Sequence, residues 1–166
     1  RDWSSDVCSS DLRESLRYAH ESGAVAVRRT TLANLGRLHF LTGEFSLAES
    51  YLDQAREISR SGSEQALGIT ESMARIYMAQ GRLLEAEALL GAVEISERES
   101  LKSGGYVHRY TLLTKAEILG RRGYLPAAID HFVEAWSLAR RAGDSILSRS
   151  EEHTSELQSR FGISYA

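Results

Sequence analysis

An all-α fold, built from repeated pairs of antiparallel helices that stack side by side, is predicted by three features of the sequence. Its 166 residues include thirteen glycines but one proline, which favours helices separated by glycine turns. Apolar residues recur at intervals of three and four, as expected for the buried stripe of an amphipathic helix. A pattern anchored on glycine returns three times along the chain. Together these features indicate a helical solenoid.

The repeated pattern is clearest when its three copies are aligned on Gly43, Gly81 and Gly123. Each glycine has a small residue seven positions before it and an apolar residue two positions after it. An alanine, a large apolar residue and a small or β-branched residue follow after five, nine and twelve positions. Copy by copy, these residues are Gly36, Phe45, Ala48, Leu52 and Ala55; Ala74, Leu83, Ala86, Leu90 and Val93; and Ala116, Leu125, Ala128, Phe132 and Ala135.

Each copy predicts two helices joined at its glycine. We expect the glycine to end the first helix in a left-handed conformation, which costs little because glycine has no Cβ atom. Ser46 and Glu49 have the spacing of a capping box at the start of a second helix, and Pro126 suits a first helical turn. The second helix of the first copy is then predicted to bury one stripe, which comprises Ala48, Leu52, Ala55 and Ile58.

A partial copy precedes the first full one. Residues 14–23 are similar to the end of the second helix in the third copy, where Ala139 and Gly143 match Ala19 and Gly23. Natural arrays end in polar caps, and no such cap is evident here, so we expect Trp136 to have packed on a further helix. The predicted organisation is half a repeat at 13–23, followed by repeats at about 29–62, 63–104 and 106–143.

This frame resembles the tetratricopeptide repeat over roughly residues 29–143. The resemblance implies a right-handed superhelical solenoid that binds a protein or peptide. The glycine anchors lie 38 and then 42 residues apart, whereas the family's usual period is about 34, and no copy ends in the family's late proline. These departures suggest the long-repeat variants of large bacterial regulators. The first copy matches best, with Leu32-Ala33-Asn34-Leu35-Gly36 followed by His39, Gly43, Phe45, Ala48 and Ala55.

The resemblance also implies a binding site, because in this family the first helix of each repeat lines a concave groove. Arginine, aromatic and methionine residues supply much of the energy of protein interfaces. Phe40, Met78 and Leu113 could equally pack between helices. Carried over position by position, the candidate groove comprises Arg37, Phe40 and Leu41 in the first repeat, Glu71, Arg75 and Met78 in the second, and Tyr110, Leu113, Glu117 and Arg121 in the third.

One binding mode of the family is not supported. Its chaperone-binding members use a lysine and asparagines to clamp a C-terminal carboxylate. A carboxylate could still be bound in another way by Arg37 or Arg75. The clamp positions here hold Ala33 and Arg37, Glu71 and Arg75, and Leu113 and Glu117.

The two ends of the chain differ from the repeats. DWSSDVCSSDL at 2–12 and RSEEHTSELQS at 149–159 can be encoded by opposite strands of one DNA segment, and that segment resembles a common sequencing-library adapter. We therefore interpret 1–12 and 149–166 as translated, non-native adapter and 13–148 as the biological sequence. Cys8, Trp3 and His153 then carry no function.

Charge gives little support for nucleic-acid binding. The two tails carry three arginines and six carboxylates, which accounts for the net charge of −3 and leaves 17 basic and 17 acidic residues between them. A balanced segment lacks a basic footprint, although Tyr106, Tyr110, Arg121 and Arg122 could form a small basic and aromatic patch. We expect a protein or peptide as the partner, and neither nucleic acid nor a membrane.

We expect no catalytic, cofactor-binding or metal-binding residue and no cofactor. The sequence has no phosphate-binding loop or dinucleotide fingerprint. His39 shares its frame position with Tyr77 and Leu119, which favours a packing role. No apolar run approaches the roughly 18–20 residues that span a bilayer, and Cys8 alone forms no internal disulfide, so a cytoplasmic protein is expected. The remaining histidines, which form no ligand pair, are His20, His108 and His131.

The predicted function is a protein- or peptide-binding scaffold, the interaction or sensory arm of a larger bacterial signalling or transcription-regulatory protein. Two alternatives stay open. The chain could be part of a multidomain enzyme or DNA-binding regulator whose active domain lies elsewhere, and a Walker loop or helix-turn-helix in the flanking sequence would favour this. The groove could instead sense a small molecule, which predicts stabilisation by that ligand.

Overall fold

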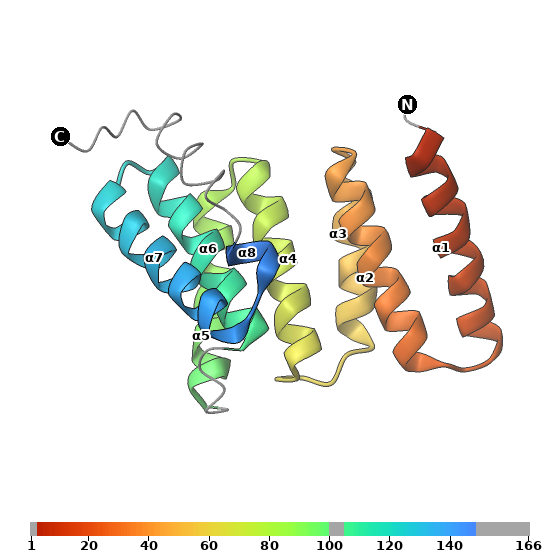
Figure 1. Ribbon diagram of the computed structural model, residues 1–166. Coiled ribbons are helices and arrows are strands. Elements are labelled where there is room, and N and C mark those ends of the chain that lie inside the picture. The colour runs from red at the N-terminus through yellow and green to blue at the C-terminus, as the bar shows by residue number, and fades with distance from the viewer. Residues whose placement is uncertain (1–2, 100–104, 149–166) are drawn as a thin grey trace. The chain divides into compact units, whose positions relative to one another are not determined.

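The computed structural model describes residues 3–99 and 105–148, and within these ranges it contains helices and no strand (Figure 1). The all-α prediction is therefore confirmed. The helices are α1 (Trp3–Glu21), α2 (Val25–Leu41), α3 (Phe45–Glu57), α4 (Glu64–Ala79), α5 (Leu83–Glu99), α6 (Tyr106–Arg121), α7 (Leu125–Ala142) and α8 (Ser145–Ser148).

The chain divides into two compact units at residue 103. Unit 1 holds α1 to α5; each of these helices packs on the next one along the chain, and α2 also contacts α4. Unit 2 holds α6 to α8, in which α6 packs on α7 and α7 on α8. The three predicted helix pairs are therefore α2 with α3, α4 with α5, and α6 with α7, the arrangement of a helical solenoid.

The turn after each first helix has the conformation that the sequence predicts. Gly43 has a φ of +78°, in the left-handed region. Its N–H donates to the carbonyl of Phe40 at 3.1 Å, and the N–H of Glu44 donates to the carbonyl of His39 at 2.8 Å. This pair of bonds is the Schellman motif, which satisfies carbonyls that the end of a helix leaves without partners.

The same pair of hydrogen bonds recurs at four other glycines. Gly81 and Gly123 end α4 and α6 with φ of +79° and +84°. Gly23 and Gly143 end α1 and α7 in the same way, with φ of +67° and +69°. The predicted match between the partial repeat and the end of the third repeat therefore holds at the level of the backbone.

The core of unit 1 forms among α2, α3 and α4. Ala48, Leu52 and Ala55 are at most 2 % exposed, as the predicted stripe requires, and Ile58 is half-buried against them. Gly36 of α2 lies so close to α3 that a Cβ atom there would stand 2.7 Å from the Leu52 Cγ atom. The other members of this core are Leu32, Ile69, Met73 and Ile76.

One local prediction needs correction. The capping box predicted at Ser46 and Glu49 is wrong: α3 begins at Phe45 with Glu44 as its N-cap, and no side chain caps it. The chain passes from the glycine turn directly into the helix, so Ser46 already lies inside it. Pro126 does lie in the first turn of α7, as predicted.

The helix α1 starts at Trp3, so it continues through residue 13, the predicted start of the biological sequence. Residues 3–12 contain no glycine or proline, and nothing in their sequence ends a helix that continues backward from residue 13. The adapter origin of 1–12 and 149–166 stays a prediction, and 149–166 lie outside the described residues.

Arg82 links three helices of unit 1. Its guanidinium lies 3.3 Å from the Glu49 carboxylate of α3, pairs with Glu85 of α5, and stands 3.7 Å from the ring centroid of Tyr77 in α4. Gln80 also donates to Glu49 at 2.8 Å. The hydrogen bond between Arg82 and Glu85 raises the pKa of the arginine and lowers the pKa of the carboxyl. These contacts of Arg82 and Gln80 join the first repeat to the second.

The close approach at Gly36 can be tested against a glycine that has open space around it. Gly36→Ala forces Leu52 to move, and overpacking of this kind costs about 1–3 kcal/mol, more than the roughly 1 kcal/mol that alanine gains over glycine in a helix. A Cβ atom at Gly91, inside α5, would meet nothing within 4 Å. We therefore expect Gly36→Ala to lower and Gly91→Ala to raise the free energy of unfolding, measured in urea. Shifts of the same sign would contradict the packing described here.

The small residue at the start of α5 offers a second test. Ala86 is 0 % exposed, so Ala86→Leu should lower the free energy of unfolding by about 1–3 kcal/mol through overpacking. Ala92→Leu, at an exposed position of the same helix, should stay within about 0.5 kcal/mol of the wild type. Urea midpoints measure both, and equal losses would show that Ala86 is not held in a tight contact.

Candidate partner-binding site

The helices α2 and α4 contact each other; α2 has one exposed side, and the matching side of α4 is mostly half-buried. The residues of these sides follow at intervals of three and four along each helix, so they share one side of it. Those of α4 stand 38 residues after those of α2, the same spacing as the glycine anchors, so the two sides are equivalent. We call this surface the α2–α4 face; it comprises Thr30, Asn34, Arg37 and Leu41 of α2 and Gly68, Ser72, Arg75 and Ala79 of α4.

Two arginines hold matching positions on this face. Arg37 and Arg75 each precede the glycine anchor of their repeat by six residues. Arg37 is exposed, whereas Arg75 is half-buried because its guanidinium lies over the ring of Phe40, 5.6 Å from the centroid. Phe40 itself is half-buried against the core. The ring therefore holds Arg75 in place by a cation–π contact while leaving its hydrogen-bond donors available.

The other groove candidates of unit 1 divide into buried and exposed. Glu71 and Met78 are only 5 % and 4 % exposed, so neither offers surface to a partner. For Met78, this burial agrees with the packing alternative. Leu41 is 73 % exposed at the end of α2 and does belong to the surface.

In unit 2 the groove candidates form one stripe along α6. Tyr110, Leu113 and Glu117 are half-buried, and Arg121 is exposed. Arg121 donates to the Glu117 carboxylate at 2.9 Å. Tyr106, one turn before Tyr110, extends the stripe, and the centroids of the two rings lie 4.4 Å apart.

Three residues at these surfaces were not among the groove residues predicted from the sequence. Asn34 and Ser72 stand three residues before Arg37 and Arg75, on the same side of their helices. Tyr106 was considered only as part of a basic patch. The signal that finds all three is helical spacing counted backward from a predicted groove residue.

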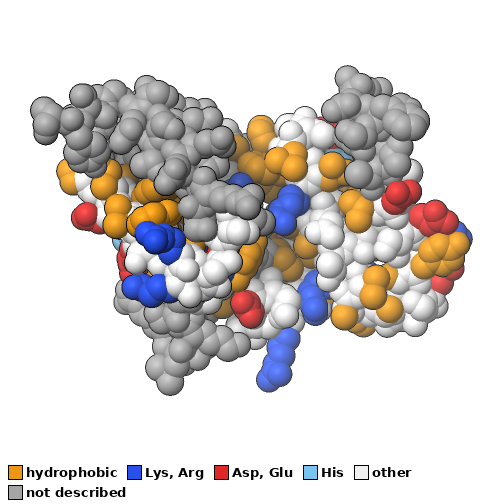
Figure 2. All heavy atoms as spheres, in the orientation of Figure 1, with side chains coloured by type: hydrophobic (Ala, Val, Ile, Leu, Met, Phe, Trp, Pro, Cys, Tyr) orange, Lys and Arg blue, Asp and Glu red, His pale blue; other side chains and the backbone are white. Residues whose placement is uncertain are grey.

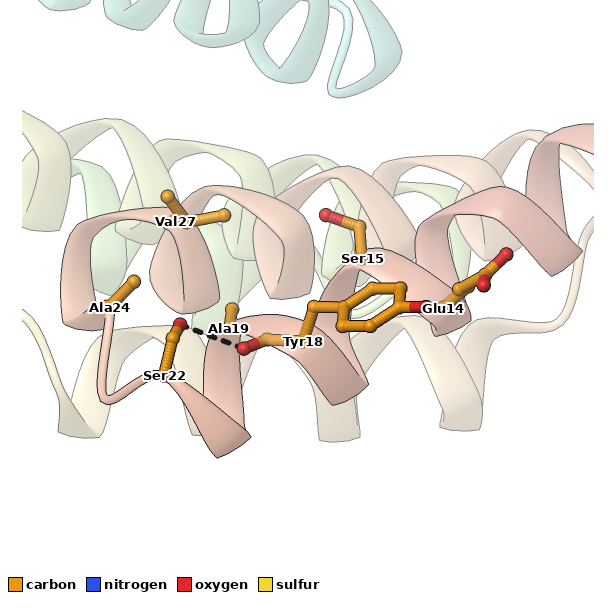
Figure 3. A pocket seen from close by; sticks show the side chains of 7 residues that line it. All are labelled: Glu14, Ser15, Tyr18, Ala19, Ser22, Ala24 and Val27. Atoms are coloured by element: carbon orange, nitrogen blue, oxygen red, sulfur yellow. Dashed lines mark hydrogen bonds between the residues drawn. The ribbon is translucent and has the colours of Figure 1, made fainter.

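A shallow surface depression of about 530 Å³ lies beside α1 (Figure 3). Its polar side chains are a carboxylate and hydroxyls, and the Ser22 hydroxyl donates to the backbone carbonyl of Tyr18 at 2.7 Å. No imidazole, thiol or basic group stands among its lining residues. Its lining comprises Glu14, Ser15, Tyr18, Ala19 and Ser22 of α1, Ala24 of the turn and Val27 of α2.

The histidine of the first repeat has a packing role, as predicted. His39 is 5 % exposed and stacks on Tyr51 with ring centroids 5.3 Å apart. Its Nδ1–H donates to the Glu44 carboxylate across the glycine turn. Among residues 3–99 and 105–148, no group of three histidine, cysteine or acidic side chains is placed to hold a metal ion.

On the face shown in Figure 2, lysine and arginine side chains (blue) are scattered among apolar and neutral ones and do not gather into one patch. In the part of the chain that the structure describes, no helix combines the length and the apolar character needed to cross a bilayer.

Comparison with known proteins agrees with this architecture. Residues 28–61 match the family model of the tetratricopeptide repeat, a range that nearly coincides with the first predicted repeat. Seven chains of solved structures match the fold. One is the crystal structure of BtubC (BKLC) from P. vanneervenii, with a TM-score of 0.65 and 19 % identity over 82 % of this chain and 56 % of that chain. No curated protein matches the sequence.

The match at 28–61 covers α2 and α3, the pair that carries the close approach at Gly36 and the glycine turn at Gly43. With the repeated helix pairs, it shows that this part of the chain is similar to a tetratricopeptide repeat.

Proposed function

We propose that this chain is a binding module that recognises a protein or peptide through the first helices of its repeats, and that it does not catalyse a reaction. The observation that carries the proposal is the α2–α4 face, where an arginine repeats at equivalent positions of adjacent helices. Tetratricopeptide repeats generally mediate interactions between proteins, which supports the same reading. The partly exposed stripe of α6, from Tyr106 to Arg121, is the corresponding surface of unit 2.

The proposed setting is the cytoplasmic interaction or sensory arm of a larger bacterial signalling or transcription-regulatory protein. Repeats spaced by 38 and 42 residues support this setting, because long repeats are typical of such regulators. The chain spans 56 % of the length of BtubC, so an activity elsewhere in a longer protein is compatible with a binding role here. The predicted biological sequence, residues 13–148, contains no cysteine, which is compatible with a reducing compartment.

Selection of peptides from a random library on the immobilised full chain tests the binding role. We expect enriched peptides whose binding is lost in Asn34→Trp, because the indole would cover the α2–α4 face. Gln54→Trp, at an exposed position of α3, should leave binding unchanged. Fluorescence anisotropy with the enriched peptides measures both variants. If every enriched peptide binds Asn34→Trp as well as it binds the wild type, the face is not the binding surface.

A further inference from the structure

We propose that α5 carries a docking surface of its own, separate from the α2–α4 face, which binds a basic amphipathic helix of another protein. The surface is a stripe of apolar and small residues. Leu84 and Ile95, at its two ends, are 73 % and 60 % exposed. Between them, two alanines are exposed and a glycine is half-buried. We call this stripe the α5 seam; it comprises Leu84, Ala88, Gly91, Ala92 and Ile95.

The α5 seam lies on the side of its helix that faces away from the core. Leu84, Ala88, Gly91 and Ile95 follow at intervals of four, three and four, so they share one side of α5. The opposite side is buried where α5 packs on α4, and it carries the core residues of this helix. A helix that is apolar on two opposite sides is normally covered on both. The core residues are Ala86, Leu90 and Val93, which are at most 2 % exposed.

The other two repeats are largely polar at the equivalent positions. Counted from the glycine anchors, these positions hold Ser46, Ser50, Asp53, Gln54 and Glu57 in α3 and Pro126, Asp130, Val133, Glu134 and Ser137 in α7. In α3, four of the five residues are exposed even though α4 packs on α3. Stacking of the next repeat therefore does not cover this side of a second helix, and it does not explain the α5 seam.

Gly91 indicates what the seam contacts. Glycine destabilises the interior of a helix relative to alanine. A Cβ atom at Gly91 would meet nothing within 4 Å, so no contact among the described residues requires a glycine there. The close approach of another backbone is one reason for glycine in a helix. Because the distance between packed helices depends on the side chains at their contact, Gly91 and the two alanines beside it allow a partner helix to lie close to α5.

The charge of α5 favours a basic partner. The helix has five glutamates and one arginine, a net charge of −4, and residues 83–96 contain no lysine, arginine or histidine. Charged residues beside the apolar seam of paired helices determine which partner is chosen. A second copy of this chain would bring two acidic helices together, and like charges across an interface oppose binding. A helix whose apolar seam is flanked by lysine or arginine has the complementary charge.

Selection from a library of helical peptides on the immobilised full chain tests the proposal. Isolated helices shorter than about 12–15 residues are marginal in water, so the peptides have about 20 residues. All carry one leucine and alanine seam, and the flanking positions vary among lysine, glutamate and glutamine. We expect lysine to be enriched. In fluorescence anisotropy, a lysine-flanked peptide should bind about tenfold more tightly than a glutamate-flanked one, and rising ionic strength should reduce this difference.

Substitutions in the seam locate the binding site. Leu84→Gln removes an apolar side chain and should weaken binding of the lysine-flanked peptide about tenfold, whereas Ser46→Gln, at the equivalent position of α3, should leave it unchanged. Gly91→Leu prevents the close approach and should also weaken binding about tenfold; Val133→Leu, at the equivalent position of α7, is its control. Circular dichroism confirms that each variant is folded. Asn34→Trp, on the α2–α4 face, should leave binding of the helix unchanged.

Several results would overturn the proposal. Enrichment of glutamate, or equal affinity for lysine-flanked and glutamate-flanked peptides, would exclude a basic partner. Equal binding to the wild type, Leu84→Gln and Gly91→Leu would show that the peptides bind elsewhere. A selection that enriches no peptide would exclude a helix as the partner. A dimer in sedimentation equilibrium that Leu84→Gln dissociates would assign the seam to a second copy of this chain.

Discussion

The left-handed glycine turn is the constraint on which the rest of the structure depends. At Gly43 and Gly81 the same two backbone hydrogen bonds end a first helix and fix the direction in which the second helix leaves. The two first helices can then present equivalent positions on the same side, as Arg37 and Arg75 do. The side chains that contact each other across the turn differ between the repeats. His39 contacts Glu44 in the first repeat, and Tyr77 contacts Arg82 at the equivalent positions of the second.

Much of this fold could be predicted because its determinants are local or periodic. A glycine at a helix end and a buried stripe at intervals of three and four need no knowledge of distant residues. The starting residues of α3 and α1 could not be predicted in this way, because they depend on the backbone conformation next to each helix. Ser46 is not an N-cap because α3 begins at Phe45, two residues before the start that the capping-box spacing predicts. Trp3 begins α1 because nothing between it and residue 13 stops a helix that packing on α2 sustains.

The candidate site was less predictable than the fold. A resemblance to a family gives the positions of groove residues in the repeat, but it does not give the burial of their side chains. It placed Arg37 and Leu41 on the surface, but it also chose Glu71 and Met78, whose side chains are buried. Burial depends on which side of a helix meets a neighbour, and a shift of one residue turns a side chain by about 100°. The position of Arg75 depends on the ring of Phe40 in another helix, a contact that no spacing along one helix reveals.

The central claim is that the first helices of unit 1 form the surface that recognises a partner. Chemical-shift mapping on the ¹⁵N-labelled chain, titrated with a peptide selected on it, tests this claim most directly. The account predicts that the largest shifts fall on the backbone amides of Asn34, Arg37, Ser72 and Arg75. Shifts concentrated instead on α3, or on the depression beside α1, would contradict it.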